Sequence, residues 1–96
     1  MEADLPATIP STSLPVVVLI NGDQCYELVK KDGDDLTVMS WNRYCHRTVE
    51  EMAGFKATPA VRVVKGNGTW MYGVTHDEGT DWYVAGKRFP AVRKKR

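Results

Sequence analysis

The sequence predicts one α/β domain, a mixed four-stranded sheet flanked by helices, in the order β-α-β-α-β-β-α. Three observations predict it. The unbroken aliphatic run at 16–20 is typical of a strand covered on both faces. A helical spacing of apolar residues ends near Gly54. Two strand-like segments flank the turn at 66–68. An early strand-helix-strand unit normally forms a right-handed parallel crossover, and the closing hairpin adds an antiparallel edge.

Length and composition set the broad class. The 96 residues are enough for one modest core, and contents of 43% hydrophobic and 26% charged residues are typical of globular proteins. No apolar run is long enough to span a bilayer, and Glu2 and Asp4 stand where a secretory signal would be positive. We therefore expect an intracellular, cytoplasmic protein with no membrane partner.

Composition and charge divide the chain into three predicted parts: a flexible N-terminal arm at 1–13, a domain at 14–89 and a basic tail at 90–96. The arm is rich in proline, serine and threonine and has no periodicity. Six positive charges lie in the last ten residues, at Lys87, Arg88, Arg93, Lys94, Lys95 and Arg96. Such a cluster favours binding to nucleic acid or to an acidic protein and can act as a nuclear address, whereas the alternative is a solvated end.

The first half of the domain has two interpretations. After the strand at 16–20, Asp23 can cap a short helix that runs from Cys25 to Val29. The alternative is a hairpin that returns at 25–30, because Asn-Gly is a strong hairpin signal. A turn at 31–34 then leads to a second strand at 35–40, which alternates and contains β-branched residues.

The second half predicts a helix, a hairpin and a last helix. The first helix ends at Ala53, and its apolar face consists of Tyr44, Thr48, Val49, Met52 and Phe55. Thr48 and Glu51 have the spacing of a capping box, and Gly54 suits a helix end. The segments 60–64 and 69–72 form the hairpin, headed by Pro59. Acidic residues after His76 favour a final helix over 76–86, although two glycines weaken it.

Cysteine and histidine provide few candidates for chemistry. Cys25 and Cys45 are too few for a disulfide scaffold and lack the spacing of a zinc site, so we expect free thiols and no metal. We expect Cys45 to be inert and half-buried, and His46 and His76 to be surface residues. The three tryptophans are more typical of packing than of base stacking.

Three segments in one order resemble the thioredoxin-like superfamily, in particular glutaredoxins and small glutaredoxin-like redoxins. Residues 17–25 resemble the first strand and its active-site cysteine. Residues 54–59 are similar to the segment that enters the cis-proline strand, and residues 70–73 to the glycine-bearing turn before the last helix. The resemblance implies a cis Thr58–Pro59 bond that lies beside Cys25.

The same resemblance implies a monothiol oxidoreductase with Cys25 as the nucleophile. A thiol at a helix N-terminus has a lowered pKa, because the helix dipole stabilises the thiolate. Leu28 stands where dithiol members have a second cysteine, so glutathione or a protein disulfide would be the co-substrate or partner. The implied substrate-binding residues are Tyr26, Thr58, Pro59 and Gly73. The alternative is a redox-inactive module of this fold that binds a protein or nucleic acid through Lys87–Arg96; a third possibility is a different small α+β adaptor.

Overall fold

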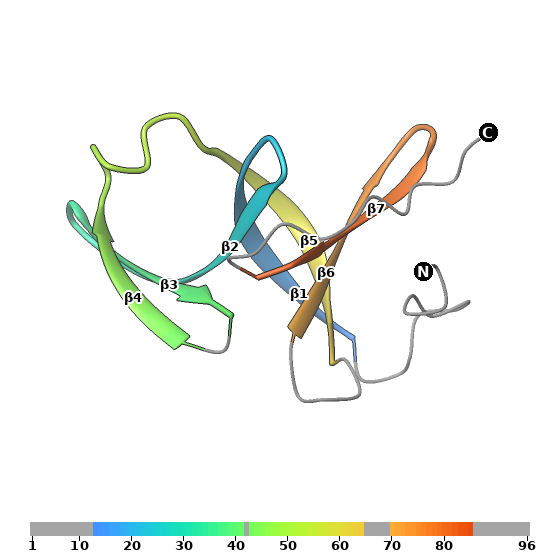
Figure 1. The fold of residues 1–96 in the computed structure, drawn as a ribbon, viewed down its shortest axis with the longest axis horizontal. Helices are drawn as coiled ribbons and strands as arrows, with labels where there is room; N and C mark the ends of the chain where they lie inside the picture. Colours follow the sequence, from blue (N-terminus) through green and yellow to red (C-terminus); the bar gives the residue numbers. More distant parts are fainter. Residues whose placement is uncertain (1–12, 42, 65–69, 86–96) are drawn as a thin grey trace.

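The structure is a computed structural model that describes residues 13–41, 43–64 and 70–85. These residues form one antiparallel sheet of seven strands in the order β4-β3-β2-β1-β5-β6-β7 (Figure 1). The strands are β1 (Leu14–Asn21), β2 (Gln24–Asp32), β3 (Asp35–Ser40), β4 (Arg43–Thr48), β5 (Lys56–Val64), β6 (Trp70–His76) and β7 (Gly79–Val84). The described residues include no helix, so the predicted α/β, thioredoxin-like fold is wrong.

The hairpin alternative for the first half of the domain is confirmed. Asn21 pairs with Gln24 across a two-residue loop, and Gly22 has φ 64°, which glycine adopts without a steric penalty. Strand β2 returns antiparallel to β1, in place of the short helix and the parallel crossover that were expected here. A second two-residue loop joins β2 to β3, and β3 occupies the predicted range 35–40.

The predicted helix that ends at Ala53 is wrong, although its capping box is confirmed. The Thr48 N–H donates to Glu51 Oε1 at 2.9 Å, and the Glu51 N–H donates to Thr48 Oγ1 at 3.0 Å. The box starts a single turn, which ends at Phe55, while residues 43–48 form β4. The apolar residues at Met52 and Phe55 therefore belong to a turn that covers the sheet, not to a helical face.

The C-terminal half contains the predicted hairpin but not the last helix. Strands β5 and β6 pair from Val61 with Gly73 to Val64 with Trp70; the connecting turn at 66–68 lies outside the described residues. Pro59 is the fourth residue of β5, not its first; it pairs with Val17 of β1 and precedes the β5–β6 ladder, which begins at Val61. Residues 79–84 form β7, because their β-branched and aromatic side chains continue the sheet after a turn.

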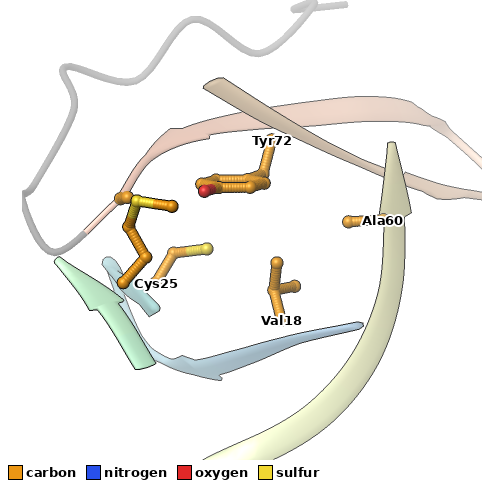
Figure 2. Packing of buried hydrophobic residues seen from close by; sticks show 6 residues of the cluster. Val18, Cys25, Ala60 and Tyr72 are labelled. Carbon is orange, nitrogen blue, oxygen red and sulfur yellow. The ribbon is translucent and has the colours of Figure 1, made fainter. Parts of the chain in front are cut away.

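The sheet curls, and the two faces of β1 bury different clusters. The interior cluster consists of Val18, Cys25, Met39, Ala60, Tyr72 and Ala85, and Figure 2 shows Val18, Cys25 and Ala60 arranged around the Tyr72 ring. The outer cluster consists of Leu19, Leu36, Val38 and Met52, with Tyr26, Leu28, Cys45 and Phe55 packed against it. The Trp41 N–H donates to the Ala85 carbonyl at 2.8 Å, and β7 contacts β2, so the curl brings the end of β7 back toward the first hairpins.

The predicted arm at 1–13 and tail at 90–96 lie almost wholly outside the described residues, and the first strand begins at Leu14. A search of the described residues finds no helix long and apolar enough to cross a membrane.

Candidate functional site

Cys25 lies in a position that opposes thiol chemistry. It is the second residue of β2, its side chain is 0% exposed, and it packs in the interior cluster. Burial raises the pKa of this thiol from 9.0 to about 12, and the Glu27 carboxylate adds to the shift. No helix N-terminus is present to stabilise a thiolate in the described part of the chain. The low pKa expected from the resemblance is therefore wrong, because the strand replaces the helix.

Of the two residues of the expected cis-proline pair, Thr58 shares the interior face of the sheet with Cys25 and Pro59 does not. Thr58 pairs with Val18 and Pro59 with Val17, so these two neighbours point to opposite faces of the sheet. Cys25 pairs with Ile20 and shares the interior face with Val18, which leaves Pro59 on the other side. No cis peptide bond occurs among the described residues, which corrects the expected cis Thr58–Pro59 bond.

Tyr26 and Gly73 are each packed against a neighbouring aromatic ring. The Tyr26 ring packs edge-on against Phe55, with ring centroids 5.6 Å apart and an interplanar angle of 72°. Gly73 is buried beneath the Trp82 ring, because a Cβ atom added at Gly73 would lie 2.8 Å from Trp82 Cζ3. Neither residue contributes to a shared site with Cys25.

A buried ionic cluster lies in the curl and was not predicted from the sequence. Glu27 is 3% exposed, and Arg62 Nη2 donates to its Oε2 at 2.6 Å. The Tyr72 hydroxyl donates to Glu27 Oε1 at 2.7 Å. The Arg62 guanidinium stacks on Trp70, 4.5 Å from the ring centroid. Three strands, β2, β5 and β6, thus meet through one carboxylate.

This cluster has the properties of a structural element. Burial and the hydrogen bond to Glu27 raise the pKa of Tyr72 above its ordinary value of 10, so its hydroxyl stays a proton donor. The carboxylate is held by two donors, which orients it and leaves it paired in the interior. The signal for it in the sequence is weak, because the pairing of Glu27 with Arg62 depends on a strand order that brings β2 and β5 to either side of β1.

The strongest candidate for binding is β4, which forms one end of the sheet. The Val49 N–H donates to the Asp34 carbonyl at 2.9 Å, so residues 34 and 49 form a hydrogen-bonded pair. Such pairs alternate along an antiparallel ladder, and the β3–β4 register continues without a shift through 35–40 and 43–48. The main-chain groups of Arg43, Cys45 and Arg47 therefore face β3, and those of Tyr44, His46 and Thr48 face away from it.

Some of these outward-facing groups already have a hydrogen-bond partner within the chain, and others do not. The turn uses both groups of Thr48, because its N–H donates to Glu51 and its carbonyl accepts from Met52. The carbonyl of His46 accepts a hydrogen bond from Arg47 Nη1 at 3.1 Å. No described strand pairs with Tyr44 or with the His46 N–H at this edge. We call the outward N–H and C=O groups of Tyr44, together with the N–H group of His46, the open edge.

The side chains of β4 give this edge a positive charge. Arg43, Cys45 and Arg47 share the face of the outer cluster, while Tyr44 and His46 lie on the opposite face, where Tyr44 is 65% exposed. The strand has two arginines and no acidic residue. The described residues as a whole have six basic and ten acidic residues, a net charge of −4, so β4 is a basic strand on an acidic sheet.

The remaining sequence-based candidates lie elsewhere. The basic cluster from Lys87 to Arg96 is outside the described residues. Within the described ranges, no group of three or more histidine, cysteine or acidic side chains is arranged to hold a metal ion.

Comparisons of the chain with protein-family models, with curated proteins and with solved structures find no match.

Proposed function

We propose that this chain is a protein-binding module that takes an extended segment of a partner as an eighth strand along β4. The observation that carries the proposal is the open edge, where main-chain donors and acceptors of Tyr44 and His46 point away from β3. Strand addition gains its affinity from such main-chain hydrogen bonds and its specificity from alternate side chains. Tyr44, at 65% exposed, supplies an aromatic contact beside the edge.

The geometry favours a polypeptide partner over other ligands. Alternating N–H and C=O groups at the strand spacing are complementary to another extended chain, which offers the same groups in the same repeat. Edge strands of this kind pair readily with further chains unless they are blocked by a proline, a bulge or a covering segment. Strand β4 contains no proline, and its ladder with β3 is regular.

Proline substitution at the edge tests the proposal. In His46→Pro, the N–H that is lost faces away from β3, so the β3–β4 ladder keeps its hydrogen bonds while partner pairing is blocked. Peptides selected on the immobilised protein from a random eight-residue display library should bind His46→Pro at least about tenfold more weakly than wild type. The matched control is Asp77→Pro, in the turn between β6 and β7, which should bind them unchanged.

Amide hydrogen exchange provides a second measurement that needs no variant. The amides of Cys45 and Arg47 should be protected in the free protein, because they bond to β3, and those of Tyr44 and His46 should exchange quickly. A selected peptide should slow exchange at Tyr44 and His46. Equal binding to His46→Pro, or unchanged exchange at both edge amides in the complex, would show that the peptides do not add to β4.

A further inference from the structure

We infer that the strand added to β4 is acidic, with carboxylates four residues apart that flank an apolar residue and meet Arg43 and Arg47. The inference rests on the proposed function and names the partner's chemistry. Arg43 and Arg47 lie two residues on either side of Cys45, on the face of β4 that packs Cys45 into the outer cluster.

The ladder geometry places these three side chains where cross-strand contacts are closest. A new antiparallel strand would form its hydrogen-bonded pairs at Tyr44 and His46, whose main-chain groups face outward. Arg43, Cys45 and Arg47 then occupy non-hydrogen-bonded pairs, in which the two side chains lie closer together. Partner residues opposite them would contact both arginines and the exposed part of Cys45.

Both arginines lack a carboxylate within the sheet. Their cross-strand partners on β3 are Ser40 for Arg43 and Leu36 for Arg47. The salt bridges found among the described residues join Arg62 to Glu27 and His76 to Asp81, and neither involves β4. Arg47 instead donates to the His46 carbonyl, so its guanidinium already lies at the edge where a partner would bind. Two arginines that face one incoming strand favour carboxylates there.

Charge also argues against a second copy of the chain as the occupant. An antiparallel β4–β4 pair that keeps Tyr44 and His46 as hydrogen-bonded partners is centred on Cys45. This register places Arg43 of each copy opposite Arg47 of the other, and like charges directly opposite each other are destabilising. A partner with carboxylates at those two positions turns the same two repulsions into attractions.

Synthetic peptides with blocked ends test the inference. The probe has the sequence Thr-Glu-Thr-Val-Thr-Glu-Thr, and its binding is followed by fluorescence anisotropy. Replacement of both glutamates by glutamine should weaken binding at least about tenfold, and replacement by lysine should abolish it, because each charge-assisted pair contributes about a factor of ten or more. A peptide of the same composition with its glutamates two residues apart should also bind more weakly.

A charge-swap variant guards against a nonspecific effect. Arg43→Glu/Arg47→Glu should reject the glutamate probe and bind its lysine counterpart, while circular dichroism and thermal unfolding check that the sheet is intact. If glutamate and glutamine probes bind equally and both are lost in His46→Pro, the acidic partner is wrong and strand addition survives. If the glutamate probe binds His46→Pro as it binds wild type, strand addition itself is wrong.

Two other occupants are outcomes of the same experiment. Displacement of the glutamate probe by an equal concentration of an oligothymidylate would overturn the inference in favour of a phosphate backbone. Sedimentation velocity that shows a wild-type dimer dissociated by His46→Pro, without any peptide, would overturn it in favour of a second copy. Binding of the glutamate probe to a monomer, with no competition by the oligonucleotide, is the expected result.

Discussion

Replacement of Glu27 by glutamine should destabilise the fold by about 2–4 kcal/mol. The carboxylate accepts from Arg62 at 2.6 Å and from the Tyr72 hydroxyl at 2.7 Å, whereas an amide has one acceptor oxygen. One donor therefore loses its partner and Arg62 loses its counterion. A hydrogen bond to a charged group contributes about 1.5–3 kcal/mol, and removal of one partner of a buried ion pair costs about 3–5 kcal/mol. Because the Arg62 side chain is 23% exposed, hydration offsets part of that cost.

Equilibrium unfolding in urea at pH 7, followed by tryptophan fluorescence, measures this change. The matched control is Glu78→Gln in the exposed turn before β7, which should change the free energy of unfolding by less than about 0.5 kcal/mol. Tyr72→Phe should cost less than Glu27→Gln, and the double variant less than the sum, because both act on one carboxylate. A Glu27→Gln variant as stable as the control would refute the view that this cluster joins β2, β5 and β6.

Three further outcomes follow from burial. A thiol reagent at pH 8 should label half-buried Cys45 in the native protein and Cys25 only after unfolding; rapid labelling of both would contradict the interior position of Cys25. The stability that the neutral Cys25 thiol provides is complete below pH 9 and is lost as the pH rises toward 12, so Cys25→Ala should flatten the alkaline decline by about 1.4 kcal/mol per pH unit, which urea unfolding at several pH values can check. Gly73→Ala should cost about 1–3 kcal/mol, because its Cβ would lie 2.8 Å from Trp82, whereas Gly54→Ala should cost less, because its Cβ would lie 3.2 Å from the Asn21 side-chain amide, which can rotate away; equal thermal stability of the two variants would contradict the Trp82 contact.

The sequence predicted turns and strands better than their connections. Asn21-Gly22 indicated the first hairpin only as the alternative to a short helix, whereas the strand at 35–40 and the pairing of β5 with β6 were predicted outright and are confirmed. These features are local, because a glycine that adopts positive φ or an alternating segment depends on few distant residues. The capping box of Thr48 and Glu51 was predictable for the same reason.

The helices failed because the spacing of apolar residues fits more than one structure. Tyr44, Thr48 and Met52 have helical spacing, yet Tyr44 lies on an exposed strand face, Thr48 begins the turn and Met52 covers the outer cluster. A short run with such a pattern does not determine a helix unless packing rewards the whole face. Here the turn that contains Met52 covers the outer cluster, and residues 43–48 gain more stability from pairing with β3 than from a helix.

The candidate site was beyond prediction because it depends on strand order. The sequence shows two arginines four residues apart, at 43 and 47, and only the assignment of that segment to an edge strand places both beside an open edge. The outward direction of the main-chain groups of Tyr44 and His46 follows from the β3–β4 register, in which Asp34 and Val49 form a hydrogen-bonded pair. Glu27 is a similar case, because the sequence shows only a charged residue in a strand-like segment. Only the folded sheet brings Arg62 and Tyr72 to its carboxylate.

Strands β4 and β7 are the two ends of the sheet, and the curl constrains them differently. The hydrogen bond from Trp41 to Ala85 fixes the chain just after β7 against the β3–β4 connection. The buried residues of the interior cluster lie in β1, β2, β3, β5 and β6 and at Ala85, and none lies in β4. Strand β4 is therefore held by its ladder with β3 and by Cys45 in the outer cluster. Exposed edges usually carry charge that discourages pairing, and Arg47 on the His46 carbonyl meets that description. Because this protection is a single half-buried arginine, a partner carboxylate would draw it from the carbonyl, so the same residue would discourage neutral strands and select acidic ones.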